Sequence, residues 1–126
     1  MRDAPVIAIV DDDGSFREAL ERLLGTFAFQ VRTFASGEEF LHSRELSSVA
    51  CLVLDVAMPG MSGFEVQRRL RGRGLRIPTV VVTAHADDDV AQRVAAAGAI
   101  AILSKPVDQQ TLLRLVHGVM GSPDTA

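Results

Sequence analysis

The chain has 126 residues, of which 48% are hydrophobic, and this predicts a single folded domain with a hydrophobic core, not a disordered segment. Its formal net charge of −3 argues against a dedicated nucleic-acid or membrane binder. Since it has one cysteine and no apolar run near the roughly 18 residues of a membrane span, we expect a cytoplasmic protein without disulfide, signal peptide or membrane segment.

Five short segments are predicted to be strands. The first two are Val6–Val10 and Gln30–Phe34, and the others are Cys51–Leu54, Thr79–Val82 and Ile100–Leu103. Most of them are nearly continuous runs of Val, Ile and Leu, which is typical of parallel strands that are covered on both faces.

Segments with a helical spacing of apolar residues separate these strands. A first helix is expected from about Phe16, with Asp13 or Ser15 as its cap, and its apolar face comprises Leu20, Leu23, Leu24 and Phe27. A short second helix is expected over Ser36–Leu41, because Glu39 follows Ser36 at the spacing of a capping box.

Three further helices complete the pattern. Phe64–Leu70 and Asp87–Ala97 are the third and fourth, and Gly98 supplies the C-terminal glycine of the fourth. The fifth begins at Val107 or Asp108, and one side of it carries Leu112, Leu113, Val116, Val119 and Met120. Five strands that alternate with five helices predict an α/β, doubly wound parallel sheet.

Polar residues follow the strands at the edge where ligands bind in such folds. Right-handed crossovers place all strand carboxyl ends on one side of the sheet. The residues that would meet there are Asp11–Asp13, Asp55, Thr83 and Ser104–Pro106. Together they offer carboxylates, a hydroxyl and an ammonium to one candidate site.

The acids admit two interpretations. Asp11–Asp13 could simply cap the first helix, and Asp55 could be an ordinary loop acid. However, neighbouring strands lie about 5 Å apart, so carboxylates that follow two of them would repel one another unless a divalent cation joined them. We favour the metal-binding interpretation because the acids follow two separate apolar strands.

Lys105 and Thr83 are informative mainly in combination. Lys105 could neutralise a phosphoryl oxygen, or it could be a surface lysine beside a helix-initiating proline. Thr83 by itself is a good strand residue. The small Ala84 that follows it leaves room for a bound group above the strand end.

Six short motifs occur in a specific order and spacing. They are Val10-Asp11-Asp12, Asp55-x-x-Met58-Pro59-Gly60, Ser62-Gly63, Thr83-Ala84, Ala97-Gly98-Ala99 and Lys105-Pro106. Over residues 5–120 the chain therefore resembles a response-regulator receiver domain of two-component signalling, most of all those that precede a helix-turn-helix DNA-binding domain. The resemblance implies a flavodoxin-like (βα)5 fold with strand order 2-1-3-4-5. It also implies a receiver domain over residues 1–120 and a flexible tail over 121–126.

The resemblance assigns roles to the site residues. Asp55 would be the phosphoacceptor for a histidine kinase or phosphotransfer protein, and Lys105 and Thr83 would contact phosphoryl oxygens. The ligands of Mg²⁺ would be Asp11, Asp12, Asp55 and the backbone carbonyl of Ala57. The bond between Lys105 and Pro106 would be cis. The domain would carry out phosphotransfer and autodephosphorylation at its own aspartate without being an enzyme.

The resemblance also implies a switch. Phosphorylation would move Thr83 and Lys105 toward the phosphoryl oxygens and shift the face formed by 87–97, 100–103 and the last helix. This face would control an output such as transcription or form a homodimer. Ile102 departs from the family, because receivers usually have an aromatic residue there. Ala57 and His85 would set the lifetime of the phosphoryl group, although His85 could equally be a solvated loop residue.

The sequence disfavours two other functions and leaves a third open. A haloacid-dehalogenase-like phosphohydrolase needs a second aspartate where Ala57 stands, and a nucleotide-binding module needs a glycine-rich loop that is absent after Val10. An interaction-only receiver that does not signal by phosphorylation stays open because of Ile102. A cluster of arginines is read as a solvated face, namely Arg68, Arg69, Arg71, Arg73 and Arg76.

Overall fold

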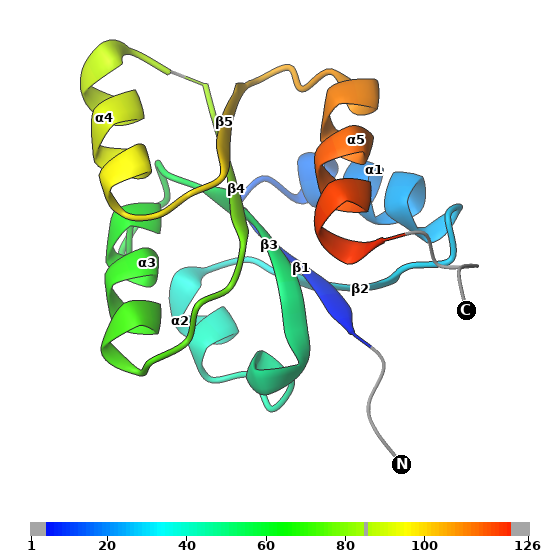
Figure 1. Ribbon diagram of the computed structural model, residues 1–126, viewed down its shortest axis with the longest axis horizontal. Coiled ribbons are helices and arrows are strands. Elements are labelled where there is room, and N and C mark those ends of the chain that lie inside the picture. Colours follow the sequence, from blue (N-terminus) through cyan, green and yellow to red (C-terminus); the bar gives the residue numbers. More distant parts are fainter. Residues whose placement is uncertain (1–4, 85, 122–126) are drawn as a thin grey trace.

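The computed structural model describes residues 5–84 and 86–121, which form one five-stranded parallel sheet flanked by helices (Figure 1). Its strands are β1 (Val6–Val10), β2 (Gln30–Phe34), β3 (Val49–Asp55), β4 (Thr79–Thr83) and β5 (Ala101–Ser104). They lie in the order β2-β1-β3-β4-β5, and each neighbouring pair is parallel. The expected flavodoxin-like, doubly wound α/β fold is thereby confirmed.

Helices cover both faces of the sheet. They are α1 (Gly14–Gly25), α2 (Gly37–Leu41), the 3-10 turn η1 (Leu46–Ser48), α3 (Gly63–Gly72), α4 (Asp88–Ala96) and α5 (Gln109–Met120). Figure 1 shows α1 and α5 on one side of the sheet and α2, α3 and α4 on the other. None of the helices in the described ranges is long and apolar enough to span a bilayer.

The sheet divides the core into two main layers. Along β1, Val6, Ala8 and Val10 pack with residues of α2 and α3, whereas Ile7 and Ile9 pack with residues of α1 and α5. All five residues of β1 are buried, as expected for a central parallel strand covered on both faces. A smaller third cluster joins α4 to β4 and β5, and it includes Val56, Val81, Val94 and Ile102.

The helix starts follow the capping signals in the sequence. The side chain of Asp13 accepts hydrogen bonds from the N–H groups of Ser15 and Phe16, so Asp13 and not Ser15 caps α1. Ser36, Ser62 and Asp87 cap α2, α3 and α4 in the same way. Asp108 occupies the cap position of α5.

Most predicted boundaries differ from the observed ones by one or two residues, and two large apolar residues lie outside the elements predicted for them. Phe27 lies beyond the end of α1 and is 40% exposed, because the chain turns after Gly25 and Ala28 adopts a φ of 65°. Ile100 directly precedes β5 and is 48% exposed, although its N–H donates to the carbonyl of Thr79 in β4 at 2.9 Å. The peptide bond between Lys105 and Pro106 is cis, as the resemblance implied. Residues 122–126 of the expected tail lie outside the described residues.

Candidate functional site

Three carboxylates meet at the carboxyl ends of the two central strands. Asp11 and Asp12 directly follow β1, and Asp55 ends the neighbouring strand β3. An oxygen of each carboxylate lies within 4.8 Å of the other two. Asp11 and Asp55 are buried whereas Asp12 is exposed, so the cluster is open to solvent on the side of Asp12. The structure thus brings together acids that lie more than 40 positions apart in the sequence.

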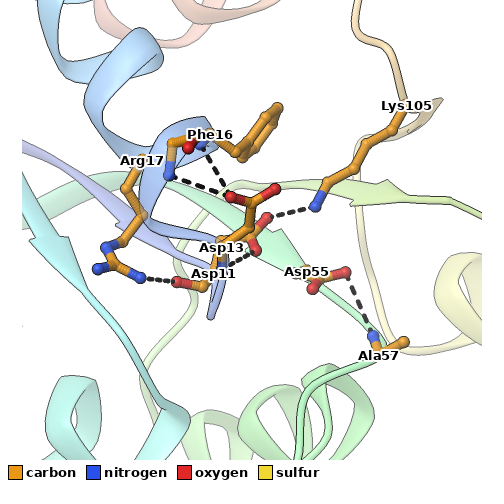
Figure 2. Close-up of polar contacts among 8 residues, drawn as sticks. Asp11, Asp13, Phe16, Arg17, Asp55, Ala57 and Lys105 are labelled. Carbon is orange, nitrogen blue, oxygen red and sulfur yellow. Dashed lines mark hydrogen bonds and ion pairs between the residues drawn. The ribbon is translucent and has the colours of Figure 1, made fainter.

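Hydrogen bonds hold the loop that carries Asp11. Its N–H donates to the carbonyl of Phe34 in β2 (3.1 Å), and its Oδ1 accepts from the N–H of Asp13 (2.9 Å). The guanidinium of Arg17 in α1 donates to the carbonyl of Asp11 (2.7 Å), as Figure 2 shows. The carboxylate is therefore fixed by the sheet on one side and by α1 on the other.

Asp55 lies in an environment that disfavours its ionised form. Its Oδ1 accepts a hydrogen bond from the N–H of Ala57 at 3.3 Å. Burial, reinforced by the negative charge of Asp11 and opposed by Lys105, raises the pKa of Asp55 from 3.8 to about 6. The carboxyl is still mostly ionised near pH 7, and a nearby cation would favour that form further.

Lys105 reaches into the cluster from the end of β5. Its Nζ forms an ion pair with Oδ2 of Asp11 at 2.8 Å and lies 4.4 Å from the centroid of the Phe16 ring (Figure 2). Burial by itself lowers the pKa of Lys105, but contact with Asp11 and the charges of Asp55 and Asp13 outweigh it and raise that pKa above its usual value. The ammonium therefore stays charged beside the acids.

Thr83 lies next to Lys105 at the same edge. It is the last residue of β4 and is buried, and its carbonyl accepts a hydrogen bond from the N–H of Lys105 at 2.8 Å. Asp55 pairs with Val82 on β4, so Thr83 is one residue from the position opposite the central acid. The acids, the ammonium and the hydroxyl thus share one edge, as the sequence predicted.

The other residues that were expected to affect phosphorylation are Ile102, Ala57 and His85. Ile102, the position where the family usually has an aromatic residue, is in the interior of β5 opposite Val81 and packs with the cluster beneath α4. Ala57 is exposed beside Asp55 and contacts it through its N–H, so the role of its carbonyl stays a prediction. His85 lies outside the described residues.

Sequence reasoning missed three contributors to the site. Phe16 was named only as the start of a helix and Arg17 was not singled out, because their contacts with Lys105 and Asp11 arise only when α1 packs beside the strand ends. Gly63 was noted only as part of a motif. A Cβ atom there would lie 2.5 Å from the carbonyl oxygen of Asp55, so glycine lets α3 begin directly against the loop that follows β3.

The donor set fits a hard divalent cation. All three clustered groups are carboxylates, and the ammonium of Lys105 forms an ion pair with one of them, Asp11. Mg²⁺ prefers oxygen ligands and is commonly bound by one or two carboxylates with water in the remaining positions. The open side at Asp12 leaves access for such ligands. A divalent cation would also reduce the repulsion from Asp11 that adds to the effect of burial in raising the pKa of Asp55.

Comparison with known proteins places the chain in a family. Residues 7–117 match the family model described as the response regulator receiver domain. The chain is 38% identical over 117 residues to the response regulator protein TodT of Pseudomonas putida, covering 93% of this chain and 52% of that protein. It is 34% identical over 118 residues to the transcriptional regulatory protein TdiR of Thauera aromatica, covering 94% of this chain and 52% of TdiR.

The solved structure of the response regulator StyR agrees with this result. It superposes with a TM-score of 0.86 at 42% identity, over 94% of this chain and 60% of that one. The chain therefore belongs to the family of response regulator receiver domains, which are signalling domains of two-component systems and not conventional enzymes. It spans about half the length of the curated relatives that it matches.

Proposed function

We propose that Asp55 accepts a phosphoryl group from the phosphohistidine of a histidine kinase or phosphotransfer protein. A carboxylate oxygen of Asp55 attacks the phosphorus, and the bond from phosphorus to the imidazole nitrogen breaks with its electron pair left on the nitrogen. The observation that carries this proposal is the position of Asp55 within 4.8 Å of two further carboxylates, at the edge where Lys105 supplies a cation. Phosphoryl transfer depends on such positioning and charge neutralisation.

The other site residues would hold and neutralise the transferred group. Asp11, Asp12, Asp55 and the carbonyl of Ala57 would bind Mg²⁺, which when bound neutralises charge on the phosphoryl oxygens. Lys105 would exchange its ion pair with Asp11 for one with a phosphoryl oxygen. The hydroxyl of Thr83 at the neighbouring strand end would donate to another oxygen.

The phosphoryl group would then act on the adjacent helices. It adds about −1.5 to −2 charges. Thr83 ends β4 and Lys105 follows β5, and α4 and α5 are the next helices along the chain. We propose that a shift of the α4-β5-α5 face controls an output in the cytoplasm, such as transcription, or forms a homodimer. A protein surface that exists in two conformations shifts their populations when a bound group favours one of them.

A receiver that acts only by protein interaction is the second candidate. Ile102 is aliphatic and packs in the cluster with Val81 and Val94, so no aromatic side chain at this position can change its rotamer with phosphorylation. In that case Asp55 would not be modified, or its modification would leave α4 unchanged. The acidic cluster favours the phosphoacceptor role.

Incubation with Mg²⁺ and a small phosphodonor such as acetyl phosphate tests the proposal. We expect one phosphoryl adduct by intact mass, lost on mild base treatment and located at Asp55 after peptide mapping. EDTA and Asp55→Asn should each abolish it. Asp13→Asn is the matched control, because Asp13 caps α1 from the same loop without belonging to the carboxylate cluster, and it should be modified normally.

Failure of the wild type to be modified, with Mg²⁺ present and the protein folded, would leave the interaction-only receiver as the better account. The lifetime prediction is tested on the same adduct. If His85 and Ala57 set the hydrolysis rate, His85→Ala and Ala57→Asn should each change the half-life of the adduct severalfold. Equal half-lives in all three proteins would remove that role.

A further inference from the structure

One cavity of the molecule lies away from the acidic cluster. It has a volume of about 620 Å³, and its walls come from the end of α3, the segment that leads into β4 and the turn between α4 and β5. These segments lie at the amino ends of β4 and β5, whereas the acids lie at the carboxyl ends. The volume is within the range of about 300–1,000 Å³ that small-molecule sites occupy.

A buried hydrogen-bond acceptor without a partner lines this cavity. The side chain of Gln67 in α3 is only 4% exposed, and its Oε1 accepts no hydrogen bond from the described residues. A buried amide oxygen without a donor destabilises a fold, and such groups are rare in native proteins. A ligand with an N–H or O–H group would satisfy it.

The charged residues of the cavity wall are arginines. Arg71 and Arg76 both line it, and neither forms an ion pair or a side-chain hydrogen bond among the described residues, in contrast to Arg68 and Arg69, which pair with Glu65. No acidic side chain occurs among the described lining residues. The unbalanced positive charge of the wall is complementary to an anionic group.

The rest of the wall is mostly apolar. It is formed largely by short or aliphatic side chains from the three segments, namely Leu70, Leu75, Ile77, Pro78, Ala96 and Ile100. Ile100 is 48% exposed and, with Phe27, is one of the two exposed large hydrophobic residues in the described part of the chain. An apolar ring or chain bound here would remove that side chain from water.

We propose that this cavity between α3 and α4 binds a small organic anion that has an apolar body and one hydrogen-bond donor. The anionic group pairs with Arg71 and Arg76, the donor reaches Oε1 of Gln67, and the apolar body covers Ile100 and its neighbours. The site does not depend on phosphorylation, because none of its residues belongs to the acidic cluster.

Indole-3-acetate is a suitable probe, because it combines a carboxylate, an aromatic body and one N–H donor. Titration of the ¹⁵N-labelled protein should give saturable amide shifts at Gln67, Gly74 and Gly98, with a Kd of about 1 mM or tighter. The amides of Asp12 and Asp55 should not shift. Indole-3-acetamide, which keeps the donor and ring but lacks the charge, should bind about tenfold more weakly.

Matched variants separate the proposed contacts from general effects. Arg71→Gln combined with Arg76→Gln should weaken binding about tenfold, whereas Arg69→Gln, on the same helix but paired with Glu65, should leave the Kd unchanged. Gln67→Leu should weaken binding severalfold without lowering the midpoint of thermal unfolding, because it removes an acceptor that lacks a partner.

The proposal is overturned if no saturable shifts occur at the cavity up to about 20 times the expected Kd, or if the double arginine variant binds as well as wild type. Shifts at these amides on dilution of the protein alone would show instead that a second copy covers the cavity. Asp55→Asn should bind the probe with unchanged Kd, so this test and the phosphorylation test fail or succeed independently.

Discussion

The centre of the sheet and its β5 edge differ in how firmly their residues are held. Every residue of β1 and nearly all of β3 is buried, and the acids follow these two strands directly. By contrast, the residues of β5 are partly exposed or exposed, and Val94 is the one fully buried residue within α4. The carboxylates thus follow two tightly packed central strands, and a lightly packed helix lies next to them. Lightly packed elements are the ones that open or shift at low free-energy cost.

The tight packing below the acids should be the most sensitive to added volume. Gly63→Ala would place a methyl group 2.5 Å from the carbonyl oxygen of Asp55 and should lower the free energy of unfolding by about 3 kcal/mol, measured by urea denaturation. Gly72→Ala is the control, because no heavy atom lies within 4 Å of its added Cβ. Similar losses in both variants would contradict the proposed tight approach of α3 to the β3 loop.

A matched pair of valines tests whether the central strands are packed more firmly than α4. Val53 in β3 is completely buried, and Val53→Ala should lower the free energy of unfolding by about 2.5 kcal/mol. Val90 in α4 is only partly buried, and Val90→Ala should lower it by less than about 1 kcal/mol. Amide exchange at α4 should nonetheless increase more in the second variant. Equal losses of stability would show that α4 is packed as firmly as the centre.

The raised pKa of Asp55 makes the folded protein less stable at neutral pH than it would be without this charge. Because folding raises this pKa from 3.8 to about 6, the ionised carboxylate destabilises the fold above about pH 6, and the penalty is absent below about pH 4, where the group is protonated in both states. Without Mg²⁺, Asp55→Asn should therefore be more stable than wild type by about 2 kcal/mol at pH 7 and equally stable at pH 3.5.

Added Mg²⁺ should reduce the advantage of Asp55→Asn, since the cation favours the ionised carboxylate of the wild type. Asp12→Asn serves as the control, because Asp12 is exposed and its neutralisation should change stability less. Chemical denaturation at the two pH values, with EDTA and with Mg²⁺, provides the measurement. A wild type that is as stable as Asp55→Asn at pH 7 without metal would contradict the burial effect.

The smallest effect is expected at the contact that joins α4 to α3. The guanidinium carbon of Arg93 lies 3.8 Å from the centroid of the Phe64 ring, a cation–π contact at a partly exposed site. Arg93→Gln should lower the free energy of unfolding by about 0.5 kcal/mol and increase amide exchange in α4. Gln92→Ala, on the exposed side of the same helix, should leave exchange unchanged. No difference between the two would mean that the contact does not restrain α4.

The sequence by itself determined most of the architecture. The strand and helix periods, with cap residues such as Asp13 and Ser62, were sufficient to predict the alternation of elements and thus a parallel sheet whose carboxyl edge gathers Asp11, Asp55 and Lys105. This worked because each signal is local: a period, a cap or a turn acts within a few residues. The errors at Phe27 and Ile100 concern element ends, where local preferences are weakest.

Only the tertiary structure decided what those residues touch. The pairing of Lys105 with Asp11, the ring of Phe16 beside that ammonium and the approach of Gly63 to Asp55 all join separate elements, so no spacing in the chain encodes them. The same holds for Gln67, which the sequence pattern places on a helix without indicating what it contacts. Packing buries its amide oxygen at the cavity between α3 and α4, where no described residue donates a hydrogen bond to it. Distances, burial and pKa are properties of the packed molecule, because each depends on atoms that come together only when the chain folds.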